Sequence, residues 1–161
     1  TADAGDMYWM DEDTVAIGRS YRTNQDAVDQ MRGVLAADGV KVEVFDLPHD
    51  LGPEYCLHLM STVSPVREDL AVVYEKLAPV AMLQSLARRG IEWVVVDDEE
   101  YVTLGCNILA VRPGVVLMGE RNVRTADALR EKGVEVHTFV SEQSDKGEGG
   151  PTCMTRPILR A

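Results

Sequence analysis

The 161-residue sequence lacks long hydrophobic runs and basic patches. No apolar stretch approaches the roughly 18 residues that a membrane-spanning helix needs, so a membrane protein is not expected. The formal net charge is -11, which argues against nucleic acid or an anionic membrane surface as a partner. An acidic chain instead attracts cationic substrates, although the same charge also serves solubility alone.

Cysteine is scarce as well, because Cys56, Cys106 and Cys153 are the three in the chain. An odd number at wide spacing does not fit the disulfide framework of a secreted protein, so we expect a reducing, cytoplasmic location. A metal site built from these thiols and His58 is an alternative. No pair among them has the Cys-x-x-Cys or His-x-x-x-His spacing that such sites use, so we predict no metal.

What remains is the composition of an ordinary globular protein, 45% hydrophobic and 27% charged. A chain of this length can bury a core, and we expect residues 1–161 to form a single domain. The sequence begins at Thr1 rather than at a methionine. We therefore expect a fragment, a processed chain or a renumbered segment.

Secondary-structure patterns recur three times in the same order. Residues 7–10 and 14–18 are typical of two strands joined as a hairpin, and a helix capped by Asn24 follows. Each predicted helix ends at a glycine. In the first repeat the strands are 14–18 and 40–45, and the helix ends at Gly39. In the second, the strands are 70–74 and 91–96, and the helix 80–89 ends at Gly90. In the third, the strands are 115–119 and 134–139, and the helix 125–132 ends at Gly133.

Such a repeat predicts an α/β fold of ββαβ units, each a strand, helix and strand preceded by another strand, around a pseudo-symmetry axis. Equivalent loops of the units would converge at that axis. A site assembled there would draw single residues from several units. The loops at matching positions are residues 46–60, 97–107 and 140–153.

The segment around Cys153 carries a chemical signal. Glycines and a proline fill much of residues 147–151, ahead of the thiol, which indicates a tight loop whose backbone can approach whatever the thiol contacts. A nucleophile would use such a setting, and a disordered tail is the alternative. Met154, Ile158 and Leu159 favour the loop, because they are typical of a strand that returns to a core.

His58 is the candidate base for this thiol. Its neighbours in Cys-Leu-His-Leu-Met are apolar, so the ring is expected to enter the interior. A lone histidine in such a setting is more often a structural group, and its pairing with Cys153 is what makes it a candidate. His49, in an acidic loop, and His137, within a predicted strand, are weaker candidates.

Two polar segments near the N-terminus complete the candidate site. Asp3 and Asp6 flank a glycine that admits close approach, so they could hold a cation. Arg22, at the entrance of the first helix, could hold a carboxylate bidentately. The alternative is a solvated acidic terminus and a helix-capping segment. Together with Cys153 and His58, these charges suit an amino-acid substrate with a positive side chain.

At these residues the sequence resembles the guanidino-group-modifying enzymes of the pentein fold, which include dimethylarginine dimethylaminohydrolase, arginine deiminase and the amidinotransferases. Residues 149–157 are similar to the nucleophile segment of arginine deiminases. Residues 22–25 and 57–59 are more similar to the dimethylarginine enzyme. Residues 3–6, Asp-Ala-Gly-Asp, resemble the family's Glu-Gly-Gly-Asp.

The resemblance implies a pentein-type α/β propeller, with about three of its five units in this chain. It implies a cysteine-dependent hydrolase that converts arginine or a methylated arginine to citrulline through a covalent thiouronium adduct, without a metal or organic cofactor. The implied site comprises catalytic Cys153, His58 and Asp3 and substrate-binding Asp6, Arg22, Gly149 and Gly150.

Two departures from the family pattern shape this prediction. Arginine deiminases carry an Asp two residues after the catalytic His, where this chain has Met60, and the difference favours the dimethylarginine reaction. The remaining propeller units are not in this chain, so a further N-terminal segment or a second polypeptide is expected to supply them, and a homo-oligomer stays open. Arginine deiminase, an amidinotransferase and a catalytically silent ligand-binding module are the alternative functions.

Overall fold

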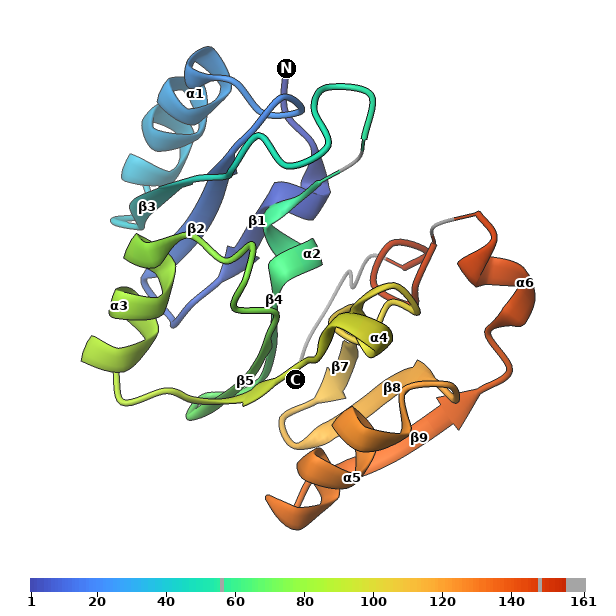
Figure 1. Ribbon diagram of the computed structural model, residues 1–161. Coiled ribbons are helices and arrows are strands. Elements are labelled where there is room, and N and C mark those ends of the chain that lie inside the picture. Colours follow the sequence, from blue (N-terminus) through green and yellow to red (C-terminus); the bar gives the residue numbers. More distant parts are fainter. Residues whose placement is uncertain (56, 148, 156–161) are drawn as a thin grey trace.

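The computed structural model describes residues 1–55, 57–147 and 149–155. Three units follow one another along the chain (Figure 1), and each has a three-stranded sheet of its own. In every unit the middle strand pairs antiparallel with the first strand and parallel with the third. Cys56, Ile158 and Leu159 lie outside the described residues. Met154, predicted to belong to the same strand as Ile158 and Leu159, instead lies in a turn and is 58% exposed.

The first unit shows how local sequence signals set the elements. It consists of η1 (Ala4–Asp6), β1 (Met7–Trp9), β2 (Thr14–Arg19), α1 (Gln25–Ala36) and β3 (Lys41–Asp46). The predicted cap of α1 is confirmed, because the Asn24 side chain accepts the N–H of Ala27 at 3.0 Å. Gly39, with φ of +72°, provides the left-handed turn after the helix.

The order strand, strand, helix, strand recurs in the other two units. The second unit contains α2 (Leu59–Thr62), β4 (Val63–Arg67), β5 (Leu70–Val73), α3 (Val80–Arg88) and β6 (Glu92–Val95), and α4 (Asp98–Tyr101) follows it. The third unit contains β7 (Leu109–Arg112), β8 (Val115–Gly119), α5 (Val123–Glu131) and β9 (Glu135–Phe139), and α6 (Glu142–Asp145) follows it. None of the helices in the described ranges is long and apolar enough to cross a membrane.

The structure differs from the prediction in its short helices. Helices α4 and α6 lie within two of the predicted loops, and α2 begins at the end of the other. Four residues are too few to show a helical repeat. Helix α5 also begins two residues before the predicted start at Thr125. The Glu100 carboxylate, from α4, accepts the N–H groups of Arg124 and Thr125 at 2.7 and 2.9 Å. This cap comes from a distant segment, so the local pattern does not reveal it.

Strand β5 joins the three units into one packed body, because its side chains alternate between the two faces of its sheet. Ala71 and Val73 lie in a hydrophobic cluster with Ala16 of the first unit. Leu70 and Val72 lie in a second cluster, which includes residues of β8 in the third unit. The second sheet is therefore covered on both faces by its neighbours.

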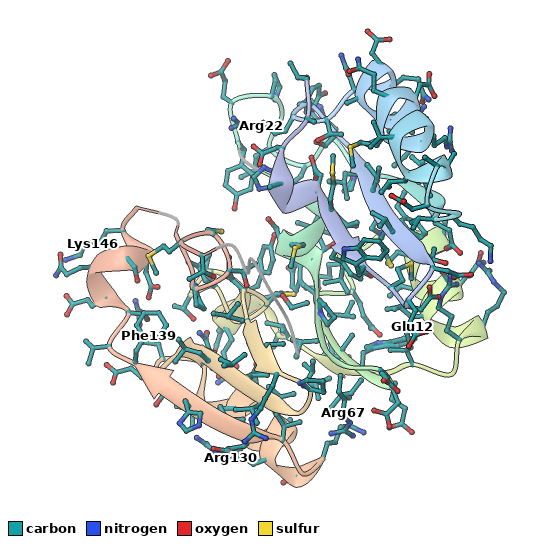
Figure 2. All side chains as sticks on the ribbon, turned by 180° about the vertical axis from the view of Figure 1, so that it is seen from behind. Glu12, Arg22, Arg67, Arg130, Phe139 and Lys146 are labelled. Carbon is teal, nitrogen blue, oxygen red and sulfur yellow. The ribbon has the colours of Figure 1, made fainter. Side chains whose placement is uncertain are left out.

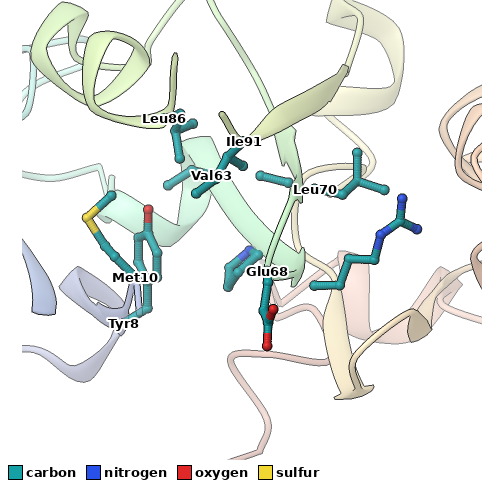
Figure 3. Close-up of a pocket in the computed structure, with 10 residues that line it drawn as sticks. Tyr8, Met10, Val63, Glu68, Leu70, Leu86 and Ile91 are labelled. Atoms are coloured by element: carbon teal, nitrogen blue, oxygen red, sulfur yellow. The ribbon is translucent and has the colours of Figure 1, made fainter. Parts of the chain in front are cut away.

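A cavity of about 20 Å³ remains where the first and second units meet (Figure 3). Tyr8 and Met10 of the first unit line it together with Val63 and Leu86 of the second. Its volume is enough for about one water molecule. We therefore regard it as a packing gap rather than a ligand site.

Candidate functional site

Asp3 and His58 lie in contact, although they belong to different units. The Nε2 atom of His58 is 3.1 Å from Oδ2 of Asp3, and the two side chains are 16% and 41% exposed, respectively. The expected entry of the His58 ring into the interior is thus confirmed. His58 therefore faces inward, whereas Asp3 keeps access to solvent.

Gly5 allows the His58 ring to lie against η1. A Cβ atom on Gly5 would be 2.6 Å from Nδ1 of His58, so a larger residue would displace the ring. The N–H of Gly5 also donates to Oδ1 of Asp3 at 3.2 Å. The glycine of the Asp-Ala-Gly-Asp segment therefore helps to position both members of the pair.

The pKa of Asp3 reflects opposing influences. Burial acts to raise it, but the hydrogen bond from Gly5 and the charges of His58 and Arg22 outweigh burial, so the pKa of this carboxyl is lowered. Asp3 is consequently ionised at neutral pH. It can balance the positive charge of an imidazolium or a guanidinium.

Asp6 is fully buried. Its Oδ1 accepts the N–H of Leu59 at 2.8 Å, and its Oδ2 accepts the hydroxyl of Ser20 at 2.7 Å. Because Leu59 is the first residue of α2, Asp6 fixes the start of that helix and, with it, the backbone next to His58. Direct substrate binding by Asp6 stays a prediction.

Arg22 (labelled in Figure 2) lies close enough to Asp3 to affect its pKa. The Nε atom of Arg22 is buried, and within the described ranges it has no hydrogen-bond partner. The backbone N–H of Arg22 donates to Oγ of Ser20 at 2.9 Å, which ties this loop to Asp6. A buried guanidinium N–H without an acceptor is costly, and a ligand oxygen would satisfy it.

A cavity of about 330 Å³ is lined by residues of the segments 19–21 and 46–55 and by Leu57. Ser20, which donates to Asp6, and Leu57, which precedes His58, both line it. Tyr21 and His49 line it as well, and the Tyr21 hydroxyl lies 2.6 Å from Nδ1 of His49. Asp3, Asp6, Arg22 and His58 are not among the residues that line this cavity.

Cys153 lies in a turn that packs against the start of β7. Its thiol is exposed, and Nδ2 of Asn107 donates to Sγ at 2.9 Å. Thr152 ties the same turn down, because its N–H donates to Oδ1 of Asn107 and its hydroxyl to the carbonyl of Ile108. The predicted tight loop is thus confirmed for residues 149–155.

The other described thiol contrasts with Cys153. Cys106 is only 1% exposed, and burial raises its pKa to about 12. Such a thiol stays protonated at neutral pH, so it is a poor nucleophile.

We expect Gly150→Ala to lower the free energy of unfolding by about 1–3 kcal/mol through overpacking, because a Cβ there would lie 2.3 Å from Cγ of Asn107. Gly149→Ala is the matched control, since its Cβ would meet no atom nearer than 3.9 Å. Denaturant unfolding of the intact protein measures both changes. Equal losses would show that the turn does not pack closely on Asn107.

The predicted site residues fall into two groups. Asp3, Asp6, Arg22 and His58 form one, and Gly149, Gly150 and Cys153 form the other. Figures 1 and 2 both show the second group's turn beside α4, on the side of the third unit that faces α2. The described hydrogen bond of Cys153 is to Asn107 rather than to His58, so a single shared site stays a prediction.

Among the described residues, no three His, Cys, Asp or Glu side chains gather as a metal site would require. Asn107 was not predicted as a functional residue. Its place in one of the three loops expected to converge was the available signal, but a lone asparagine has no distinctive pattern.

Comparison with known proteins relates this geometry to a class of enzymes. The arginine deiminase family model matches residues 87–160, which include Asn107 and Cys153. The arginine deiminase of Mycoplasma capricolum subsp. capricolum is 30% identical over 193 residues, in an alignment that covers 99% of this chain and 47% of that enzyme.

Two solved structures share the fold. An amidinotransferase of the saxitoxin biosynthetic pathway from Microseira wollei has a TM-score of 0.83 and 19% identity, over 99% of this chain and 48% of that one. Dimethylarginine dimethylaminohydrolase from Pseudomonas aeruginosa, solved as a cysteine-to-serine mutant complexed with citrulline, has a TM-score of 0.75 and 22% identity, over 94% of this chain and 53% of that one.

Sequence and fold thus point to one class, the enzymes that modify guanidino groups. The chain is similar in sequence and fold to members of the pentein superfamily, so the resemblance is confirmed. It spans about half the length of the curated relatives it matches, 47% in the case of the Mycoplasma enzyme.

Proposed function

We propose that the protein containing this chain is a cysteine-dependent hydrolase that acts on the guanidino group of arginine or a methylated arginine and yields citrulline. The observation that carries the proposal is the contact of His58 with the ionised Asp3 carboxylate, at 3.1 Å. In a pentein chain with an exposed cysteine in the nucleophile segment, this pair is suited to proton transfer.

The first half of the proposed reaction forms the covalent adduct. The Cys153 thiolate attacks the guanidinium carbon and forms a C–S bond. The C–N bond to the departing amine then breaks, and protonated His58 gives its proton to that amine. A thiouronium group on Cys153 results. Asp3 stabilises the positive charges of the imidazolium and of the guanidinium.

The second half hydrolyses the adduct. Neutral His58 takes a proton from a water molecule, whose oxygen attacks the thiouronium carbon. The C–S bond breaks, the thiolate leaves, the remaining hydroxyl proton passes to solvent, and the ureido group of citrulline is released. Gly5 and Asp6 support both halves, because Gly5 admits the His58 ring and Asp6 holds the start of α2.

Met60 bears on the choice of substrate. Its side chain packs against the hydrophobic cluster between the first two units, so this position offers no second carboxylate for an unsubstituted guanidinium. We therefore favour a methylated arginine. Arginine itself is the alternative, because the sequence relatives are arginine deiminases.

We propose that Arg22 binds the substrate carboxylate, which would provide an acceptor for its buried Nε. Arg22→Ala should raise KM for amino-acid substrates by about 10- to 100-fold, since a hydrogen bond to a charged group contributes about 1.5–3 kcal/mol. Agmatine has the guanidino group but no carboxylate, so its KM or inhibition constant should change little. Steady-state kinetics with both ligands make the comparison, and equal losses would argue against this role.

We also propose that the chain is part of a five-unit α/β propeller, in which residues 1–161 belong to a single domain. Further units, from the same polypeptide or from a second chain, would pack on the outer units. Exposed apolar side chains on those units support this arrangement: Val34 in the first unit is 66% exposed, and Val111 in the third is 60% exposed. A cytoplasmic location stays an expectation from cysteine usage.

A further inference from the structure

Asn107 directs a hydrogen-bond donor at the sulfur of Cys153. Its Nδ2 lies 2.9 Å from Sγ, and its Oδ1 accepts the N–H of Thr152 at 3.0 Å. A backbone N–H can only donate, so the amide oxygen must face Thr152 and the amide NH₂ must face the sulfur. The orientation of the Asn107 side chain is therefore fixed by chemistry.

Asn107 is also held firmly in place. The residue is 7% exposed, and the close approach of Gly150 blocks one side of its side chain. On the backbone, the fully buried Ser64 of β4 donates to the carbonyl of Cys106 at 2.6 Å and accepts the N–H of Ile108. The residues on both sides of Asn107 are thus anchored to the second unit.

We infer that Asn107 is a positioning residue that aims Cys153 and stabilises its thiolate. A thiolate is a strong hydrogen-bond acceptor, whereas a neutral thiol is a weak one. A fixed N–H donor therefore favours the charged form of the sulfur. The importance of this contact for catalysis rests on the proposed function, whereas its effect on the thiol does not.

Asn107→Asp tests the inference with nearly unchanged shape. One carboxylate oxygen can still accept the N–H of Thr152, but the other replaces the donor that faces Cys153. Because like charges disfavour ionisation, the pH midpoint of Cys153 alkylation by iodoacetamide should rise by about one unit or more. Alkylation rates would be measured in the intact protein across pH, with peptide mass spectrometry to assign the label.

Thr152→Val is the matched control. It removes the hydroxyl bond to the Ile108 carbonyl and loosens the same turn, but it leaves the amide and the sulfur in contact. Its alkylation midpoint should stay at the wild-type value. If Asn107 only held the turn in shape, the Asp and Val variants would behave alike.

An unchanged midpoint in Asn107→Asp would overturn the inference. If that variant does not fold, Asn107→Ala removes the donor without adding charge. A smaller upward shift of the alkylation midpoint is then expected, and an unchanged midpoint would also overturn the inference. Alkylation does not require turnover. If the alkylation midpoint shifts in the variant but the protein does not hydrolyse guanidines, only the proposed function is contradicted. If the protein hydrolyses guanidines but the midpoint does not shift, only this inference is contradicted.

Discussion

Cys153→Ser should lower kcat by about a thousandfold or more, because it removes the atom that forms the covalent bond. The neighbours that favour a thiolate cannot ionise a serine hydroxyl, which is far less acidic than a thiol. The fold should be retained, since the Cys153 side chain is exposed. Turnover and circular dichroism of the intact protein measure the two effects.

Cys106→Ser is the matched control for the loss of a thiol. The Cys106 sulfur already donates to the carbonyl of Val72, and a serine hydroxyl can do the same. This variant should therefore keep its turnover, whatever small change in stability it causes. Retained turnover in Cys153→Ser, or equal losses in both variants, would remove Cys153 from the proposed mechanism.

His58→Ala should slow turnover by roughly 10²- to 10⁴-fold, the usual contribution of a general acid–base group. Both halves of the reaction should suffer, because the same imidazole protonates the amine and later deprotonates water. The loss should be smaller for the release of methanethiol from S-methyl-L-thiocitrulline. A thiol is a better leaving group than an amine, so its departure needs less help from an acid.

His137→Ala is the control for this variant, because His137 lies on β9, is exposed and pairs with Glu135 at 2.8 Å. It should turn over both substrates as the unaltered protein does. If single-turnover measurements showed that His58→Ala slows the release of the amine and the release of methanethiol equally, His58 would have no role as the acid of the first half-reaction.

The sequence predicted the repeat well because its signals are local. The Asn24 side chain caps α1 by accepting the N–H of Ala27, three residues further along the chain. Gly39 adopts the left-handed conformation that a helix end favours. Such features depend on neighbours within a few residues. The start of α5 was predicted two residues late because its cap, Glu100, comes from another segment.

The candidate site was predictable in part. The pairing of Asp3 with His58 followed from a resemblance to a family, since no periodicity or spacing connects residues so far apart. Asn107 was missed because its importance arises from contacts with Thr152 and Cys153 that exist only in the folded chain. Polar residues that act through tertiary contacts leave little trace in a single sequence.

The covalent adduct is the central claim, and mass spectrometry of the intact His58→Ala variant tests it most directly. With S-methyl-L-thiocitrulline the C–S bond to the enzyme should form, while the missing base should delay its hydrolysis. We predict one adduct per chain, mapped to Cys153 and absent from the His58→Ala, Cys153→Ser double variant. A protein that turns over guanidines but carries no adduct, or carries it on Cys106, would contradict the account.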